Sequence, residues 1–211
     1  MSRESRAREA ITMHGQSLHQ RGFVPGSSGN ISMRLDDGVL VTPTNVCLGR
    51  LDPVQIAKLD LNGVHVGGDA PSKEAFLHAS MYARSRHAAV VHLHSTHAVA
   101  VACICDPNSN VAPIPPITPY FVMKIGQLKV LPYFAPGATA LAHAVAEASE
   151  KHHAILLANH GPVVAGSTLD AAVFAIEELE EAAKLHLLLD GHRVNTLTSD
   201  QVQDLHSRFP S

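Results

Sequence analysis

The sequence predicts a single α/β domain whose sheet is antiparallel or mixed. Segments with a helical pattern alternate with short apolar segments typical of strands. Asp37-Gly38 and Asn62-Gly63 are turn pairs that join neighbouring strands as hairpins, and hairpin strands are antiparallel. No repeat or Pro/Ser/Gly-rich linker divides the 211 residues, a length ample for a hydrophobic core. We therefore expect one domain over residues 1–211.

The N-terminal third predicts one helix and two hairpins. Good helix formers fill Ser2–Gln20. Alternating apolar residues predict a strand over Ile31–Leu35 that returns over Val39–Val41. A second hairpin is expected over Lys58–Val66. Asp52-Pro53 precedes it and is typical of an N-cap followed by proline at the first position of a short helix.

The remainder predicts alternating helices and buried strands. Six prolines in Val111–Pro136 predict a segment that threads between elements and contains one strand. A glycine at position 191 is placed to end the last long helix. Helices are expected over Pro71–Arg86, Ser95–Cys105, Thr139–Glu150 and Leu169–Asp190, and strands over Ala88–His94, Leu128–Tyr133 and Ala154–Ala158.

Composition excludes several classes of function. Lys and Arg total 16 against 19 Asp and Glu, and charged residues make up only 17%, which argues against an extended nucleic-acid or membrane surface. The longest apolar run, Ala98–Cys105, is too short to span a bilayer, and the charged first ten residues do not resemble a secretory signal. Three cysteines give no disulfide framework. We expect a cytoplasmic protein with no nucleic-acid or membrane partner.

Histidine is the unusual residue, with 15 copies. His92-Leu93-His94 stands at the end of the predicted strand Ala88–His94, where side chains at i and i+2 point to the same face. Both imidazoles would then converge on one point, as two nitrogen ligands of a metal do. Taken alone, the pair is better explained by one packing histidine and one surface histidine.

Two further residues favour a metal centre. His160 follows the predicted strand Ala154–Ala158 in an Asn-His-Gly-Pro turn, at another strand end. Glu74 lies in the first turn of the predicted helix Pro71–Arg86, where a carboxylate also complements the helix dipole. Three imidazoles and one carboxylate suit Zn²⁺ with a position left open for substrate, and Mn²⁺ or Co²⁺ could occupy the same site.

Loops rich in hydroxyl and backbone N–H groups are candidates for binding a phosphate. Two such loops are Ser27-Ser28-Gly29-Asn30 and Thr42-Pro43-Thr44-Asn45, and Ser72-Lys73 lies at a predicted helix start. Ordinary turns have the same composition, and neither loop has the spacing of a P-loop.

Two other features predict structural roles. His78 is four residues after Glu74 and shares its helix face, which indicates a core or supporting residue. A group of four glutamates is typical of the solvated face of a long helix: Glu177, Glu178, Glu180 and Glu181. The chain has no His-Glu-x-x-His string, which counts against a zinc hydrolase of that design.

In chain order, five motifs resemble those of the class II aldolase/adducin family: Gly29-Asn30, Thr42-Pro43-Thr44, Pro71-Ser72-x-Glu74, His92-x-His94 and Asn159-His160-Gly161. The resemblance runs from about Gly22 to Leu189. It implies a three-layer α/β/α fold with a mainly antiparallel central sheet. It also implies a homotetramer with active sites between subunits.

The resemblance implies a role for each motif. A divalent metal, usually zinc, would be held by His92, His94 and His160. Glu74 would be a ligand in the free enzyme and the catalytic acid/base. The substrate phosphate would be bound by Gly29, Asn30, Thr42, Thr44 and Ser72, with Lys73 adding a cation. We also expect Tyr120 or Lys124 to contact the substrate or donate a proton, within one subunit or across a boundary, although a solvated charge explains Lys124 equally well.

Within the family, the chain resembles a subgroup that decarboxylates 3-oxo-tetronate 4-phosphates. The similar strings are Cys47–Pro53, Gly68–Glu74, His92–Thr96, Thr118–Lys124 and Glu177–Glu181. This likeness implies a metal-dependent lyase that converts a sugar-acid phosphate to dihydroxyacetone phosphate and CO₂ through an enediolate that the metal stabilises.

The alternatives use the same residues. They are a sugar-phosphate aldolase of the L-fuculose-1-phosphate type and a pentulose-phosphate 4-epimerase. Lys73 stands where the aldolase carries a serine, and no tyrosine follows Asp190, so both positions depart from the aldolase pattern. A non-catalytic adducin-like interaction domain is less favoured, because the three histidines and Glu74 are all present.

Overall fold

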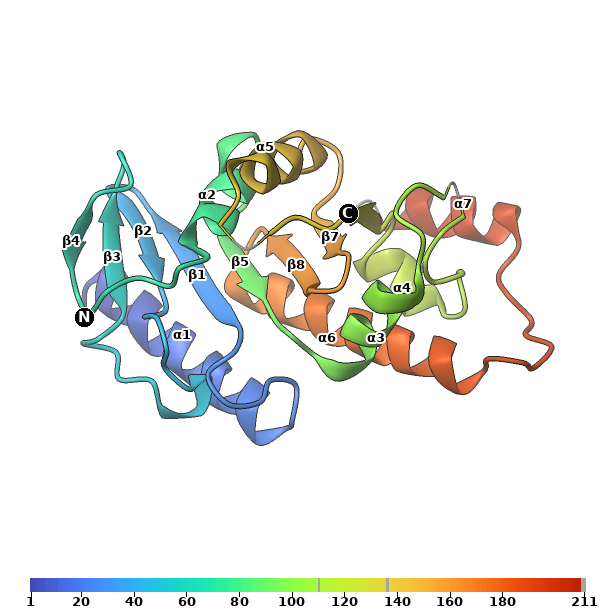
Figure 1. Cartoon of the computed structure of the whole chain (residues 1–211), viewed down its shortest axis with the longest axis horizontal. Coiled ribbons are helices and arrows are strands. Elements are labelled where there is room, and N and C mark those ends of the chain that lie inside the picture. Colours follow the sequence, from blue (N-terminus) through green and yellow to red (C-terminus); the bar gives the residue numbers. More distant parts are fainter. Residues whose placement is uncertain (110, 136, 210–211) are drawn as a thin grey trace.

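The computed structural model describes residues 1–109, 111–135 and 137–209. Pro136, the last residue of the predicted proline-rich segment, lies outside the described residues. Within them, eight strands form one mixed sheet in the order β4-β3-β2-β1-β5-β8-β7-β6 (Figure 1). The strands are β1 Asn30–Leu35, β2 Gly38–Val41, β3 Ala57–Asp60, β4 His65–Gly67, β5 Ala89–His92, β6 Lys129–Leu131, β7 Ala154–Leu157 and β8 Gly161–Gly166.

Neighbouring strands pair antiparallel except at one edge. β6 runs parallel to β7, and the remaining pairs of the sheet are antiparallel. β5 lies near the middle of the sheet between β1 and β8, with His92 opposite Asn30 on one side and Val163 on the other. The end of β5 therefore meets the start of β1 and the start of β8.

Helices cover both faces of the sheet. Figure 1 shows α2 and α5 together on one side and α1, α3 and α6 on the other. The described helices are α1 Arg3–Gln20, α2 Ala75–Ala83, α3 Thr96–Ile104, α4 Pro119–Lys124, α5 Thr139–Ala148, α6 Leu169–Leu188 and α7 Ser199–Arg208, with a 3₁₀ turn at Leu48–Arg50.

Strand alternation explains why two cores form. In β5, Val91 packs in the core with residues of α1, α3 and α6, whereas its neighbour Val90 packs in the core with residues of α2 and α5. Both valines are fully buried. A strand that is covered on both faces has no polar side chain to turn to solvent, and the apolar sequence of β5 reflects this.

Most predicted elements are confirmed, including the first helix, both N-terminal hairpins and the long helix α6. The short helix at Asp52-Pro53 is wrong: Asp52 Oδ1 accepts the N–H of Val54 at 2.9 Å in a turn, and the 3₁₀ turn comes earlier in the chain. The helix over Pro71–Arg86 begins only at Ala75. The strand at Ala88–His94 ends at His92.

Three elements were not predicted from the sequence. β8 contains a proline and two glycines, yet it lies buried between β5 and β7, so tertiary contacts override its weak strand propensity. α4 has Pro119 in its first turn and is capped by Thr118, whose Oγ1 accepts the N–H of Phe121. α7 begins with a capping box between Thr198 and Gln201.

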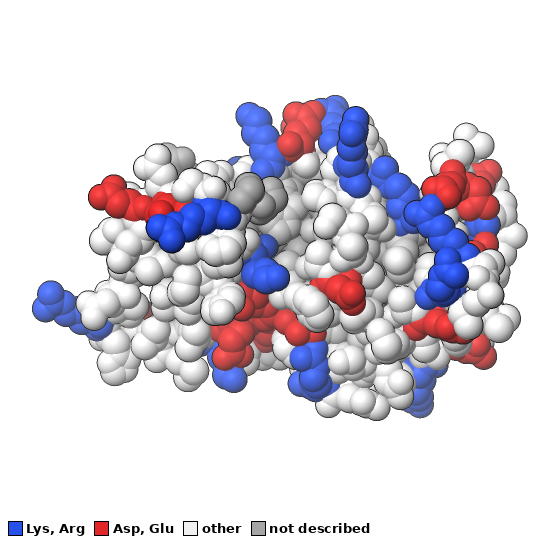
Figure 2. All heavy atoms as spheres, turned by 180° about the vertical axis from the view of Figure 1, so that it is seen from behind, with Lys and Arg blue, Asp and Glu red and all other residues white. Residues whose placement is uncertain are grey.

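On the face in Figure 2, basic and acidic side chains are interspersed and lie mostly towards the edges. Uncharged residues make up much of this face, in keeping with the 17% charged residues of the sequence. Within the described part of the chain, none of the helices combines the length and apolar character needed to cross a membrane.

Candidate metal centre

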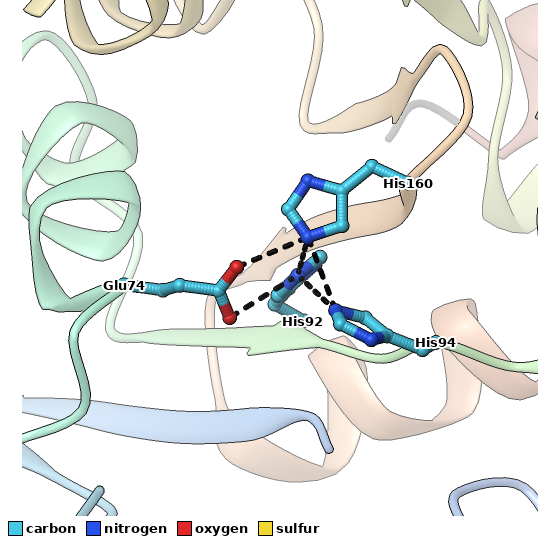
Figure 3. Close-up of side chains that lie close together, drawn as sticks. All are labelled: Glu74, His92, His94 and His160. Carbon is cyan, nitrogen blue, oxygen red and sulfur yellow. Dashed lines mark hydrogen bonds and ion pairs between the residues drawn. The ribbon is translucent and has the colours of Figure 1, made fainter. Parts of the chain in front are cut away.

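Three imidazoles and one carboxylate converge at the end of β5. Figure 3 shows Glu74, His92, His94 and His160 pointing toward a common centre from three segments of the chain. One ligand atom from each lies within 4.8 Å of the others. The Nε2 atom of His94 is 3.1 Å from that of His92 and 3.1 Å from that of His160, and the His92–His160 separation is 3.3 Å.

These separations fit a shared metal ion. In a tetrahedral site with metal–nitrogen bonds of about 2.0–2.1 Å, two ligand nitrogens are about 3.3–3.4 Å apart. Glu74 adds an oxygen 3.0 Å from His160 Nε2 and another 3.5 Å from His92 Nε2. Nitrogen ligands with one carboxylate are a donor set that suits Zn²⁺ and related divalent ions.

His92 forms the buried base of the cluster. Its side chain is fully buried at the last residue of β5. Its Nδ1 lies 2.8 Å from the carbonyl oxygen of Pro162. Because a carbonyl only accepts hydrogen bonds, Nδ1 carries the proton and Nε2 is left with its lone pair toward the centre. The backbone of β8 therefore sets the tautomer of His92.

His94 lies outside the strand, so strand alternation does not explain why it faces the same point as His92. Two glycines instead let neighbouring loops close around the segment. Gly29 has φ +77°, and a Cβ there would lie 3.1 Å from the carbonyl oxygen of His92. At Gly161, φ is +155° and a Cβ would be 2.5 Å from the Leu93 carbonyl oxygen.

The turn between β7 and β8 carries His160. Asn159 adopts a left-handed conformation with φ 58°, which asparagine tolerates better than most residues. The N–H of Asn159 donates to Ala102 of α3 at 3.1 Å, and the N–H of His160 donates to Leu157 at 3.1 Å. These bonds hold the turn against α3 and direct His160 at the cluster.

Glu74 immediately precedes α2 as its N-cap residue, one position before the helix rather than within its first turn. The helix starts late because Pro71 forms a bridge with Pro43 and the N–H of Ser72 donates to Thr42 at 3.1 Å. These contacts join the Thr42-Pro43-Thr44 loop to the Pro71-Ser72 segment that precedes α2.

Electrostatics keep Glu74 ionised and His94 neutral in the protein without metal. Burial by itself raises the pKa of Glu74, but the neighbouring His160 and His92 imidazoles and a hydrogen bond from Asn30 outweigh it and hold that pKa well below its usual range. Burial, together with the neighbouring His92 and His160, lowers the pKa of His94 to about 4. An anionic carboxylate and a neutral imidazole are the forms that bind a cation.

The comparisons identify the family. The profile described as Class II Aldolase and Adducin N-terminal domain matches residues 9–187. The chain belongs to the class II aldolase/adducin family.

Relatives named as decarboxylases are more similar in sequence to this chain than a relative named as an aldolase. The chain is 49% identical over 192 residues to the 3-oxo-tetronate 4-phosphate decarboxylase of Cupriavidus necator, covering 90% of this chain and 87% of that protein. It is 44% identical to the Pectobacterium atrosepticum protein of the same name, covering 97% and 94%. The L-fuculose phosphate aldolase of Haemophilus influenzae is 35% identical, covering 89% and 86%.

Solved structures of family members share the fold. YgbL from Klebsiella pneumoniae matches with a TM-score of 0.92 at 41% identity, covering 97% of this chain and 100% of that one. An L-fuculose 1-phosphate aldolase matches with a TM-score of 0.86 at 26% identity, covering 100% and 98%.

The phosphate-loop residues differ in how accessible they are. Thr44 and Ser72 are half-buried and Lys73 is exposed. Thr42 is buried, and its Oγ1 accepts the N–H of Ile31 at 3.2 Å. Asn30 is only 3% exposed, and its amide hydrogen-bonds inside the protein rather than facing solvent.

Tyr120 and Lys124 are not part of the cluster. Both lie exposed on α4, and Tyr120 is 62% exposed. Among the described residues, neither side chain hydrogen-bonds to a cluster residue.

One of the four glutamates on α6 is not on a solvated face. Glu180 is buried, and its carboxylate accepts the N–H groups of His97 and Ala98 at 2.9 and 2.8 Å. It therefore caps the start of α3, the helix that follows His94. The sequence prediction of a solvent-facing side chain is wrong for this residue, because a helix end packs against it.

Two groups that orient the cluster residues could not be identified from the sequence. Pro162 orients His92, and Asn30 donates to Glu74 at 2.7 Å. Two periodicities are the only sequence signals that these supporting residues lie near Glu74. Glu74 and His78 are one helical turn apart, and Asn30 and Ser32 alternate onto one face of a strand.

Proposed function

We propose that this chain is a metal-dependent carboxy-lyase that converts a 3-oxo-tetronate 4-phosphate to dihydroxyacetone phosphate and CO₂. The observation that carries the choice of reaction is the difference in identity among relatives. The decarboxylases named above are 44% and 49% identical to this chain, and the aldolase is 35% identical. The His/Glu cluster supplies a site for the metal.

The reaction breaks one carbon–carbon bond. The substrate is a β-keto acid, and when its C1–C2 bond breaks CO₂ leaves while the electron pair spreads from C2 onto the C3 ketone oxygen. A proton then adds at C2, which gives dihydroxyacetone phosphate. A divalent cation held by His92, His94, His160 and Glu74 would supply positive charge for the negative charge that develops on oxygen.

Glu74 is the residue we assign to proton transfer. Its side chain is 21% exposed, so a bound substrate can reach it, whereas His92 beside it is fully buried. Asn30 and His160 contact its two carboxylate oxygens and restrict where they lie. A carboxylate fixed beside the reacting carbon can hold the proton that C2 receives.

The remaining residues bind the two ends of the substrate in this proposal. Gly29, Thr44 and Ser72 lie in the loops before β1, after β2 and before α2, and the exposed Lys73 beside Ser72 adds a positive charge for the phosphate. Asn30 and Thr42 are buried, and in this proposal they support the loops from inside the protein: Asn30 hydrogen-bonds Glu74, and Thr42 accepts the N–H of Ile31. Tyr120 and Lys124 are exposed on α4, so they would act on a substrate held by a neighbouring subunit.

The proposal extends to the metal and the assembly. We propose Zn²⁺ as the resident ion, with Mn²⁺ or Co²⁺ as alternatives, because imidazole ligands suit zinc. A homotetramer agrees with the exposed apolar side chains of Leu61, Val64 and Val66 in the β3–β4 hairpin, which a partner subunit would bury. Residues 1–211 would form one domain, and three free cysteines fit a cytoplasmic enzyme.

A coupled assay tests the function. Metal-loaded protein is mixed with the erythronate- and threonate-derived 3-oxo-tetronate 4-phosphates, and dihydroxyacetone phosphate is followed with a reductase that oxidises NADH. We expect product from at least one enantiomer, no product after chelation, and recovery when metal is restored. A protein that acts on neither enantiomer but cleaves L-fuculose 1-phosphate would be an aldolase, and the proposed function would be wrong.

A further inference from the structure

A buried chain of hydrogen-bonded side chains ends at the Glu74 carboxylate. His78 is 1% exposed on α2, and its Nε2 lies 2.5 Å from Asn30 Oδ1. Its Nδ1 lies 2.6 Å from Ser32 Oγ, which is 2.8 Å from the Tyr82 hydroxyl. Asn30 Nδ2 in turn lies 2.7 Å from Glu74 Oε2. The side chains therefore form one path from Tyr82 to Glu74.

The carboxylate fixes the direction of every bond in this chain. An ionised Glu74 only accepts hydrogen bonds, so Asn30 must present its NH₂ group to it and its Oδ1 to His78. His78 must then carry its proton on Nε2, which leaves Nδ1 to accept the Ser32 hydroxyl. The Ser32 oxygen is free to accept from Tyr82.

Burial makes the arrangement hard to replace. Ser32 is fully buried and Asn30 is 3% exposed, so a lost partner would not be replaced by bulk water. Burial, with a smaller contribution from the nearby His92, lowers the pKa of His78 to about 3, so the imidazole is neutral as the chain requires. Without the His78 N–H, Asn30 Oδ1 would be a buried acceptor with no donor.

We propose that His78 is a positioning residue for Glu74. Its Nε2–H holds the Asn30 amide in the one orientation that donates to Glu74 Oε2. Without this hydrogen bond, the Asn30 amide can rotate and place Oδ1 against the Glu74 carboxylate, and the two acceptors repel each other. Glu74 then moves from its place beside the three imidazoles. Only the expected effect on kcat rests on the proposed function, because metal binding is measured without a substrate.

Two amide variants of His78 separate the N–H from the shape of the side chain. His78→Gln reaches as far as Nε2 and keeps a donor for Asn30. His78→Asn reaches only as far as Nδ1, so it places no donor at the Nε2 position that faces Asn30 Oδ1. His14→Asn is the matched control, because His14 is another buried helical histidine whose Nε2 has one partner, Asp170, at 2.8 Å.

The main readouts do not need a substrate. Zn²⁺ affinity is measured by competition with a chelating dye, the Co²⁺-loaded protein is compared by visible absorption, and thermal unfolding and kcat are recorded for each variant. We expect His78→Asn to weaken Zn²⁺ binding by about 10–100-fold, to change the Co²⁺ spectrum and to lower kcat. His78→Gln should stay within about threefold of wild type. His14→Asn should lower the melting temperature and leave the Zn²⁺ affinity, the Co²⁺ spectrum and kcat unchanged.

Two results would overturn the proposal. One is wild-type Zn²⁺ affinity and Co²⁺ spectrum in His78→Asn. The other is an equal loss in His78→Gln and His78→Asn, which would show that packing rather than the donor matters. If His78→Asn does not fold, His78→Met fills the space without a donor and is expected to show the same loss of affinity. A wild-type protein that binds metal but turns over no tetronate phosphate would refute the proposed function, and the affinity comparison would still decide the role of His78.

Discussion

The neutral, buried His78 should make the stability of the protein depend on pH in a way that one substitution removes. The pKa of His78 is about 3 in the folded protein, against 6.5 for a histidine in an unfolded chain. Between these pH values the unfolded chain binds a proton that the folded protein does not. The free energy of unfolding therefore falls as the pH drops from 6.5 toward 3.

The two pKa values give the size of the effect. At pH 5 the unfolded histidine is almost fully protonated and the folded one is almost fully neutral, so His78 costs about 2 kcal/mol of stability relative to pH 7.5. His78→Gln cannot titrate and avoids this cost. The free energy of unfolding of His78→Gln minus that of wild type should therefore increase by about 2 kcal/mol between pH 7.5 and pH 5.

Urea unfolding of both proteins checks this value. Chelator is present throughout and the protein concentration is fixed, so that metal binding and subunit association contribute equally to both. A difference that is constant from pH 7.5 to pH 5 would mean that His78 is charged or hydrated in the fold, and the direction argued for the hydrogen-bond chain would be wrong.

Three further predictions follow from the site and its supports. Glu74→Gln should lower kcat by about 10²–10⁴-fold in the coupled assay with little change in the circular dichroism spectrum, and wild-type turnover would contradict its role in proton transfer. His94→Ala should bind less than one zinc ion per chain by elemental analysis, and full occupancy would remove His94 from the ligand set. Glu180→Gln should lower the free energy of unfolding by about 1–3 kcal/mol in urea titrations, since the start of α3 loses an anionic acceptor, and unchanged stability would refute the capping role.

The elements that the sequence predicts well are those whose local pattern agrees with their environment. α1 and the β1–β2 hairpin have a capping residue, regular periodicity and a turn pair, and each forms where expected. β8 could not be predicted in this way, because its proline and glycines disfavour a strand and its burial between two strands decides the outcome. α4 was hidden by the prolines around it, although Thr118 and Pro119 are a recognisable helix start.

The site shows a similar division. His92, His94, His160 and Glu74 could be selected from the sequence, because each lies beside a strand or helix end in a family motif. The burial of a side chain does not follow from local pattern: the motif predicts Asn30 as a phosphate ligand, but its side chain is buried against Glu74. That contact exists only because α2 packs beside β1, a long-range arrangement that local periodicity does not encode.

The most direct test of the central claim follows the carboxyl carbon. Metal-loaded protein is incubated with a 3-oxo-tetronate 4-phosphate that carries ¹³C at C1, and labelled CO₂ and dihydroxyacetone phosphate are measured together. Decarboxylation at the His/Glu cluster predicts labelled CO₂ and unlabelled dihydroxyacetone phosphate in equal amounts, with neither formed after metal removal. Substrate that keeps its label in the metal-loaded protein, or labelled CO₂ that forms equally fast without metal, would contradict the proposed enzyme.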